Sequence, residues 1–261
     1  MADLTGSLSG RRAFVTGANS DIGYAIASAL AADGADLVLH CHGTARPGDG
    51  DAHLFDTCPV LEADFLQDQS VSDLARAVLD TGPVDILIAN AAIEERRSWQ
   101  EIGTAAVNAH VAANFTSLLL LIRDLVPPMV ERNWGRVVAI GSILAARPRA
   151  ETLVYAALKS AQLTALRAIA RDVAAGGVTM NVVSPGAIET GRTADLYADA
   201  AFRRAVAAKI PVGRPGRPAD CVAPVSMLCS DAAGYITGAD IPVDGGWGIG
   251  DAPGNLPESG Q

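Results

Sequence analysis

The chain has 261 residues, and its 29 acidic and 20 basic side chains give a formal net charge of −9. Apolar residues account for 49% of the chain and charged residues for 19%, which excludes an intrinsically disordered protein. Because nucleic acids and anionic membrane surfaces bind basic proteins, the acidic balance argues against both as partners.

Neither a membrane segment nor a secretion signal is predicted. The longest aliphatic run, residues 118–122, ends at Arg123 and is far shorter than the ~20 apolar residues of a membrane span. Residues 1–10 lack the charged and then apolar order of a signal peptide. The cysteines form no C-x-x-C pair, so we expect free thiols in a cytoplasmic protein. They are Cys41, Cys58, Cys221 and Cys229.

Apolar runs of strand length alternate with helical patterns along the chain. The expected strands span residues 12–16, 35–40, 60–63, 84–89, 136–140, 178–183 and 239–243. The expected helices lie at 22–32, 71–79, 107–130, 153–174 and 218–230. This alternation predicts an α/β fold, a single doubly wound parallel sheet of Rossmann type with helices on both faces.

The domain organisation follows from the same pattern. No linker rich in proline or glycine divides it, so residues 1–250 are expected to form one domain. Residues 251–261 are expected to be a polar C-terminal tail. Residues 42–53 contain glycine and proline where a second crossover helix would normally lie.

A glycine turn, TGANSDIG at residues 16–23, separates the first strand from the first helix. Gly17 permits a tight reversal, and Gly23 lets the helix lie close to the strand. The N-terminus of the helix offers free N–H groups and a positive dipole end to a pyrophosphate. An ordinary turn between a strand and a helix is the alternative interpretation.

Two polar residues end the third and fourth expected strands. Asp64 and Asn90 should both lie at the carboxyl edge of the sheet, where open sheets bind ligands. Asp64 could accept a hydrogen bond from an adenine amino group, or it could cap the following helix. Asn90 could equally be structural and tie neighbouring strands together.

Tyr155 and Lys159 are four residues apart in a helical segment and therefore share one face. A neighbouring ammonium group lowers the pKa of a phenol, which would make Tyr155 a proton donor and acceptor near neutral pH. Ser142 ends the preceding strand and could reach the same point, and Asn114 lies on the preceding long helix. A solvated helix face is the alternative for the Tyr-Lys pair taken alone.

Together these motifs resemble the short-chain dehydrogenase/reductase family over about residues 9–247. The intervals from Ser142 to Tyr155 and from Tyr155 to Lys159 follow the family pattern. The nearest subgroup in appearance is the 3-oxoacyl-carrier-protein reductases. The matching stretches are TGANSDIG (16–23), ANAA (89–92), Asn114, IGS (140–142), YAALK (155–159), NVVSPGAIET (181–190) and ITGADIPVDGGW (236–247).

The resemblance implies an NAD(P)(H)-dependent oxidoreductase that transfers a hydride between a nicotinamide cofactor and a ketone or secondary alcohol. Tyr155 would be the general acid or base, and Ser142 would hydrogen-bond the substrate oxygen. Lys159 would bind the nicotinamide ribose and lower the pKa of Tyr155. Asn114 would hold a water that relays protons to Lys159. The implied cofactor-binding residues are Gly17, Asn19, Ser20, Asp21, Ile22, Gly23, His42, Asp64, Phe65, Asn90, Ala91, Tyr155, Lys159, Pro185, Gly186, Ile188 and Thr190.

The chain departs from the family pattern in the glycine turn, where Asp21 replaces the middle glycine of TGxxxGxG. A carboxylate repels a pyrophosphate, so we expect the Asp21 side chain to point away and only its backbone N–H to be used. Ala89 and Ala92 replace the first and last residues of NNAG, and the methyl group of Ala92 narrows the space near the cofactor.

The end of the second strand bears on the choice between NADP and NAD. Relatives that prefer NAD carry an acidic residue where this chain has Cys41. Relatives that prefer NADP often carry arginine at the next position, which here is His42, with Arg46 nearby. Since neither position is acidic and nothing there should repel a 2′-phosphate, we favour NADP over NAD.

The sequence His40-Cys41-His42 also raises the possibility of a metal. Strand alternation puts the two histidines on one face and Cys41 on the other, whereas zinc requires three or four converging ligands. We therefore expect no metal and interpret the segment as a strand end followed by a loop.

The sequence constrains the substrate less than the cofactor. Arg147 and Arg149 could meet a substrate carboxylate or phosphate, but solvated loop charges are the favoured interpretation. In carrier-protein reductases, the basic residues that dock the acidic carrier stand where this chain has Asn133 and Gly176. The expected pocket borders are Ile93, Glu94, Leu144, Arg147, Arg149, Thr152 and residues 191–197.

We therefore predict a reductase of small free ketones or alcohols, since the net charge also opposes an acidic partner. A 3-oxoacyl-carrier-protein reductase is one alternative. The other is a dinucleotide-binding sensor without catalysis, suggested by Asp21 and the interrupted second crossover. The family resemblance further implies a homotetramer, with the two long helices and the last strand at its interfaces.

Overall fold

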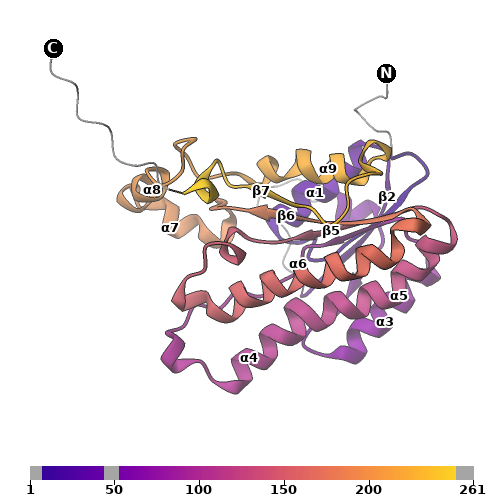
Figure 1. Ribbon diagram of the computed structural model, residues 1–261, viewed down its shortest axis with the longest axis horizontal. Coiled ribbons are helices and arrows are strands. Elements are labelled where there is room, and N and C mark those ends of the chain that lie inside the picture. Colours follow the sequence, from indigo (N-terminus) through magenta and orange to yellow (C-terminus); the bar gives the residue numbers. More distant parts are fainter. Residues whose placement is uncertain (1–7, 44–52, 251–261) are drawn as a thin grey trace, which may run out of the picture.

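The computed structural model describes residues 8–43 and 53–250, and within them it forms one seven-stranded parallel sheet (Figure 1). The strand order is β3-β2-β1-β4-β5-β6-β7. The predicted doubly wound parallel sheet is confirmed, and no predicted strand end is wrong by more than two residues. The strands are β1 (Arg12–Val15), β2 (Asp36–Cys41), β3 (Val60–Glu62), β4 (Ile86–Ala89), β5 (Gly135–Ile140), β6 (Val178–Pro185) and β7 (Asp240–Val243).

Helices cover both faces of this sheet, as Figure 1 shows. One face carries α1 (Asp21–Ala32) and α9 (Val222–Cys229). The other face carries α3, α5 and α6, with α4 extending from them. The bounds of these four helices are α3 (Asp68–Asp80), α4 (Thr104–Val111), α5 (Ser117–Glu131) and α6 (Leu153–Val173).

Two hydrophobic clusters fill the space between the sheet and its helices. Phe14 and Leu87 belong to the cluster beneath α3, α5 and α6, whereas Val15 and Ile88 belong to the cluster beneath α1 and α9. Successive strand residues point to opposite faces, so each strand supplies both clusters. This explains why the central strands consist almost entirely of apolar residues.

The helical stretch Thr104–Glu131 joins α4 to α5 through a π-helical segment, Ala112–Thr116. Its 28 residues are long and apolar enough, by length and composition, to cross a membrane. The same is true of core helices in globular proteins, and Leu121, Leu125 and Met129 of this stretch are fully buried against the sheet. The absence of a membrane partner stays a prediction.

Three short helices were not predicted. They are α2 (Leu54–Thr57), α7 (Ala194–Ala198) and α8 (Ala200–Ala207), which are too short for a helical period to stand out in the sequence. The crossover after β2 contains α2, although most of the segment flagged in the sequence, residues 44–52, lies outside the described residues. Arg46 and the expected tail, residues 251–261, also lie outside them.

Candidate active site

A cavity of about 730 Å³ opens at the carboxyl edge of the sheet, within the ~300–1,000 Å³ typical of small-molecule sites. It reaches from the turn after β1 to the segment after β6. Gly23 and Asn114 do not line it. The predicted site residues that do line it are Gly17, Asn19, Ser20, Asp21, Ile22, His42, Asp64, Phe65, Asn90, Ala91, Ser142, Tyr155, Lys159, Pro185, Gly186, Ile188 and Thr190.

The turn after β1 requires both of its glycines. Gly17 has a φ of +63°, and a Cβ atom there would lie 2.9 Å from the Cα atom of Ala91. A Cβ atom on Gly23 would lie 2.3 Å from the Gly17 carbonyl oxygen. The turn therefore packs directly on the end of β4 and directs the N-terminus of α1 at the cavity.

Asn90 has the structural role that the sequence left open. Its side-chain amide donates to the Thr16 and Gly17 carbonyls, both at 2.9 Å, and to the Ser20 hydroxyl at 3.1 Å. Ser20 in turn caps α1 by accepting from the Gly23 N–H. One asparagine thus holds the glycine turn, the helix cap and the end of β4 together.

Asp21 lines the cavity, whereas its side chain was expected to point away from it. Its Oδ2 atom accepts a 2.7 Å hydrogen bond from the backbone N–H of Gly191, in the segment after β6. The side chain that replaces a family glycine is therefore held by a distant part of the chain. Asp64 has a local partner as well, because its Oδ1 atom accepts from the Leu66 N–H at 2.9 Å, and it does not cap α3.

His40 is buried beneath the glycine turn and also lines the cavity. Its Nδ1 atom accepts from the Gly17 N–H at 3.2 Å, so its Nε2–H donates to the Ala63 carbonyl at 3.1 Å. Burial lowers its pKa to about 4, and its ring stacks on Phe65 at 4.3 Å. His40 is therefore a neutral structural residue. The alternation of residues along β2 did not indicate this role.

The acidic environment at the end of β2 differs from the expectation. Glu62 on β3 pairs in register with Cys41, and its carboxylate accepts from the Gly43 N–H at 3.3 Å. Glu62 was not predicted, because it belongs to the neighbouring strand and not to β2. The expectation that no acidic group lies there to repel a 2′-phosphate is therefore wrong. His42 remains on the cavity wall.

Metal ligands do not converge at this edge. Among the residues that the structure describes, no group of three or more His, Cys, Asp or Glu side chains could hold a metal ion. The four cysteines are free, and all but Cys58 are buried.

Ser142, Tyr155 and Lys159 converge at the other end of the cavity. The Ser142 hydroxyl lies close enough to the Tyr155 phenol to act on its pKa, and Ser142 is held in place by the Leu144 N–H at 3.1 Å. The Lys159 ammonium is buried, donates to the Ile140 carbonyl at 2.6 Å and lies 5.5 Å from the centre of the Tyr155 ring. The Tyr155 hydroxyl therefore lies among polar groups that are held in place after β5 and on α6.

The pKa of Tyr155 differs from the expectation. It is raised to about 12, mainly by burial and in part by the negative charge of Glu94, while the Ser142 hydroxyl acts to lower it. Lys159 was expected to lower it, but burial reduces the pKa of the lysine itself to about 8. Loss of water around the phenol is the largest cause of the raised pKa of Tyr155.

Asn114 is buried next to the cavity wall and holds the loop after β4. Its side chain accepts from the Ile93 N–H and donates to the Ile93 carbonyl, both at 2.8 Å. Its backbone carbonyl lies in the π-helical segment and accepts from the buried Gln162 amide. Gln162 was not predicted as a site residue. Its amide already donates to the backbone carbonyl of Asn114, the residue that was expected to hold a relay water.

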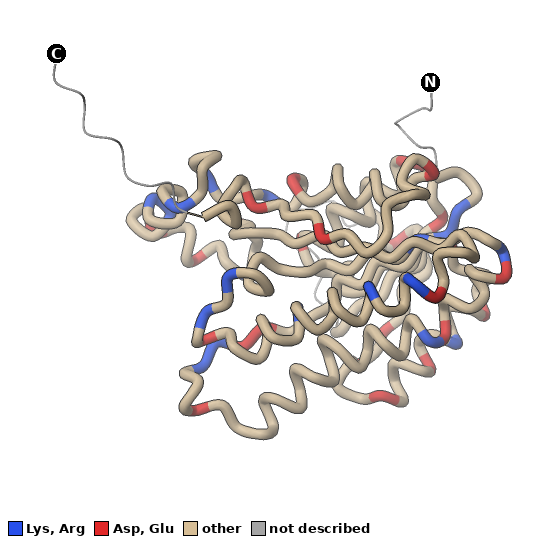
Figure 2. Tube along the Cα trace, in the orientation of Figure 1, with Lys and Arg blue, Asp and Glu red and all other residues tan. Residues whose placement is uncertain are grey.

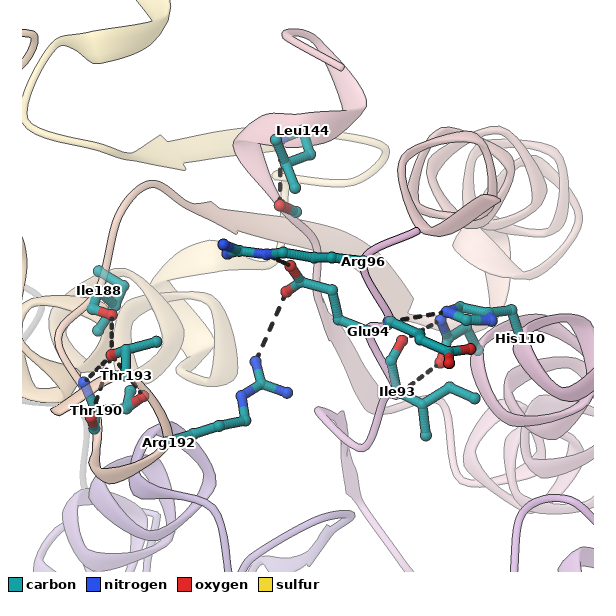
Figure 3. A network of polar contacts seen from close by, with 12 residues as sticks. Ile93, Glu94, Arg96, His110, Leu144, Ile188, Thr190, Arg192 and Thr193 are labelled. Atoms are coloured by element: carbon teal, nitrogen blue, oxygen red, sulfur yellow. Dashed lines mark hydrogen bonds and ion pairs between the residues drawn. The ribbon is translucent and has the colours of Figure 1, made fainter. Parts of the chain in front are cut away.

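Charged side chains surround the cavity between the loop after β4 and the segment after β6 (Figure 3). Glu94 lies between Arg96, at 3.2 Å, and Arg192, at 3.7 Å. Arg149 lines the cavity as predicted. Arg147 does not, because its guanidinium donates to the Trp247 carbonyl. The other expected border residues on the wall are Ile93, Leu144, Thr152, Gly191, Thr193 and Tyr197.

Known proteins resemble this chain in sequence and in fold. A family model described as enoyl-(acyl carrier protein) reductase matches residues 17–248. The 3-oxoacyl-carrier-protein reductase of Salmonella typhimurium is 33% identical over 92% of this chain and 98% of its own. The chain belongs to the short-chain dehydrogenase/reductase family. It is therefore an oxidoreductase that interconverts carbonyl and hydroxyl groups with a nicotinamide cofactor, NADP or NAD.

Solved structures agree with this assignment. A 3-oxoacyl-carrier-protein reductase from Agrobacterium tumefaciens, with NADP bound, has a TM-score of 0.86 and 34% identity, over 93% of this chain and 95% of its own. A candidate NAD(P)-dependent gluconate 5-dehydrogenase from Beutenbergia cavernae, also with NADP, has a TM-score of 0.86 and 33% identity, over 94% of this chain and 99% of its own. This short-chain dehydrogenase/reductase has the fold of both.

Proposed function

We propose that this protein reduces small free ketones with NADPH, using Tyr155 as the acid, Ser142 to bind the carbonyl oxygen and Lys159 to position the cofactor ribose. The observation that supports it is that Ser142, Tyr155 and the buried Lys159 meet in the same cavity as the α1 N-terminus. Ser142 and Tyr155 can donate two hydrogen bonds to one oxygen, which favours the charge that develops there.

The residues of the cavity fit a dinucleotide. The N-terminus of α1 faces one end and can receive a pyrophosphate, and the segment from Pro185 to Thr190 borders the other end. When bound, the cofactor supplies the hydride. The pKa of about 12 keeps Tyr155 protonated at neutral pH, so the phenol is ready to donate in the direction of reduction.

The preference for NADP is supported by the two neighbours that contain it and by His42, which is not acidic. Glu62 acts in the other direction, because its carboxylate lies beside Gly43. We place the preference on His42 and treat Glu62 as the residue that weakens it.

We further infer one domain over residues 1–250, a homotetramer, and a soluble cytoplasmic location without nucleic acid or membrane partners. The tetramer is supported by residues 104–122, which contain no Asp, Glu, Lys or Arg, and by the half-exposed Leu153 at the start of α6. Figure 2 shows this long uncharged stretch along α4 and the start of α5. Sedimentation of the full chain tests the assembly.

Reduction of a carrier-linked 3-oxoacyl group is the second candidate, favoured by the carrier-protein reductases among the relatives. Melting the protein with NADPH, NADP, NADH and NAD tests dinucleotide binding, since a ligand at ~100 times its Kd adds about 2.7 kcal/mol. NADPH oxidation is then followed with a free ketone and with a carrier-linked one. Turnover of the carrier-linked substrate alone would replace the first proposal with the second.

A further inference from the structure

The part of the cavity that leads to Tyr155 carries an excess of positive charge. Arg96, Arg149 and Arg192 line it, and Glu94 is their carboxylate counterpart among the described lining residues there. The other lining carboxylates, Asp21 and Asp64, accept backbone N–H groups. The chain as a whole is acidic, with a net charge of −9, so the positive charge of this part of the cavity is opposite in sign to that of the protein.

Glu94 holds two of these arginines at the cavity without using up their donors. Its Oε1 atom pairs with Arg96 and its Oε2 atom with Arg192, as Figure 3 shows. The Glu94 side chain is only 17% exposed, whereas that of Arg192 is 69% exposed. A guanidinium has five N–H donors, so a single contact at 3.7 Å leaves most of those on Arg192 free to bind another oxygen.

Arg149 makes fewer polar contacts than Arg96 and Arg192. Its guanidinium lies over the Trp247 ring at 5.6 Å, and it forms no ion pair with any residue in the described part of the chain. Stacking on an indole fixes the plane of the group and leaves its edge open. Arg149 and Arg192 thus approach the cavity from the loop after β5 and from the segment after β6.

These charges lie close to the reacting groups. Glu94 and Arg192 both act on the pKa of Tyr155, in opposite directions. The neighbouring walls are apolar, from Leu144, Tyr197 and Trp247, so water screens the charges less there than on an open surface. A substrate whose anionic group binds these arginines would therefore need only a short carbon chain to bring its carbonyl oxygen to Tyr155.

We propose that the substrate is a short oxo acid whose carboxylate binds Arg192 and Arg149 while its carbonyl oxygen lies at Ser142 and Tyr155. The inference rests on the proposed ketone reductase function. In the reaction the carbonyl carbon gains a hydride from the reduced nicotinamide and the oxygen gains the Tyr155 proton. The carbonyl becomes a secondary alcohol, the cofactor is oxidised, and the carboxylate is unchanged.

The test compares 4-oxopentanoate with its methyl ester, which has the same ketone without the charge. We expect the wild-type kcat/KM to be at least about tenfold higher for the acid, the ratio that corresponds to about 1.4 kcal/mol. Arg149→Met and Arg192→Met should each raise the KM for the acid relative to that for the ester and leave the KM for NADPH unchanged, because any effect through the pKa of Tyr155 acts on both substrates alike. The double variant should abolish the preference.

Arg204→Met is the matched control, because Arg204 is exposed on α8, does not line the cavity and carries the same charge. It should leave the preference unchanged. Equal wild-type kinetics for acid and ester, or a higher KM for NADPH rather than for the acid in Arg192→Met, would overturn the inference while the ketone reductase stands. Absence of turnover with both substrates and both reduced cofactors would overturn the reductase function as well.

Discussion

The two ends of the cavity are built in different ways. Lys159 and Asn114 are buried at the end that contains Tyr155, and their side chains are held by backbone atoms of β5 and of the loop after β4. At the other end, beside the glycine turn, His42 is exposed after β2 and the partly buried Asp21 begins α1, where it contacts Gly191, far away in the sequence. One end is buried core, and the other lies closer to the surface.

This difference explains where the chain departs from its family. A change at the end that contains Tyr155 would leave a buried donor or acceptor unpaired, at a cost of about 1–3 kcal/mol for each group. A change at the end beside the glycine turn alters the charges that meet the cofactor but leaves the fold intact. The departures at Asp21 and His42 are both changes of charge near the cofactor site and not changes of a buried hydrogen-bonding group.

The largest effect is expected at the end that contains Tyr155. Tyr155→Phe removes the proton donor but keeps the buried ring, so kcat for ketone reduction should fall about 10³-fold. The increase in melting temperature with NADPH should be retained, because the ring still closes the site. Unchanged turnover would refute the assignment of Tyr155. If the increase disappeared as well, Tyr155 would be essential for cofactor binding, and the two ends would not be separable.

The sequence predicted that Ser142, Tyr155 and Lys159 meet at one point, because the information there is local. Tyr155 and Lys159 share one helix, and Ser142 closely follows the strand before it. The contacts that were missed join segments far apart in the chain. Gly191 binds Asp21, and no spacing rule brings two such residues together.

The energetics were also harder to predict than the positions. The pKa of Tyr155 depends on how much water the fold excludes, which the spacing of Tyr155 and Lys159 does not reveal. The short helices α7 and α8, which carry the side chains of the cavity mouth, were too short to show a period. Family membership therefore follows from the sequence, whereas the substrate charges follow only from the assembled loops.

The next largest effect is expected where the cofactor ribose meets His42. His42→Asp adds a negative charge opposite the expected 2′-phosphate, so the ratio of kcat/KM for NADPH to that for NADH should fall on the order of tenfold. Glu62→Gln removes a charge beside Gly43 and should raise the same ratio. Steady-state kinetics with both cofactors decide this. A change of the same sign in both variants would mean that neither residue contacts the phosphate.

A smaller effect is expected at the glycine turn. Asp21→Asn keeps an acceptor for the Gly191 N–H but removes the charge near the pyrophosphate, so NADPH should bind about fivefold more tightly, about 1 kcal/mol. Fluorescence titration of NADPH measures the Kd. Asp195→Asn is the control, because Asp195 is exposed on α7 and does not line the cavity. Weaker binding in Asp21→Asn would mean that the carboxylate contact with Gly191 itself closes the site.

The smallest effect links the charged rim to the end that contains Tyr155. Glu94 raises the pKa of Tyr155, so Glu94→Gln should lower it. In alcohol oxidation the phenol must be ionised to accept a proton, and kcat/KM therefore rises with pH up to that pKa. The rising limb in Glu94→Gln should lie on the order of half a pH unit lower, as expected for one partly screened charge. Glu95→Gln is the matched control, because Glu95 pairs with Arg97 and does not line the cavity. If both variants shifted the limb equally, the long-range field of the loop, rather than the Glu94 carboxylate in the cavity, would control the tyrosine.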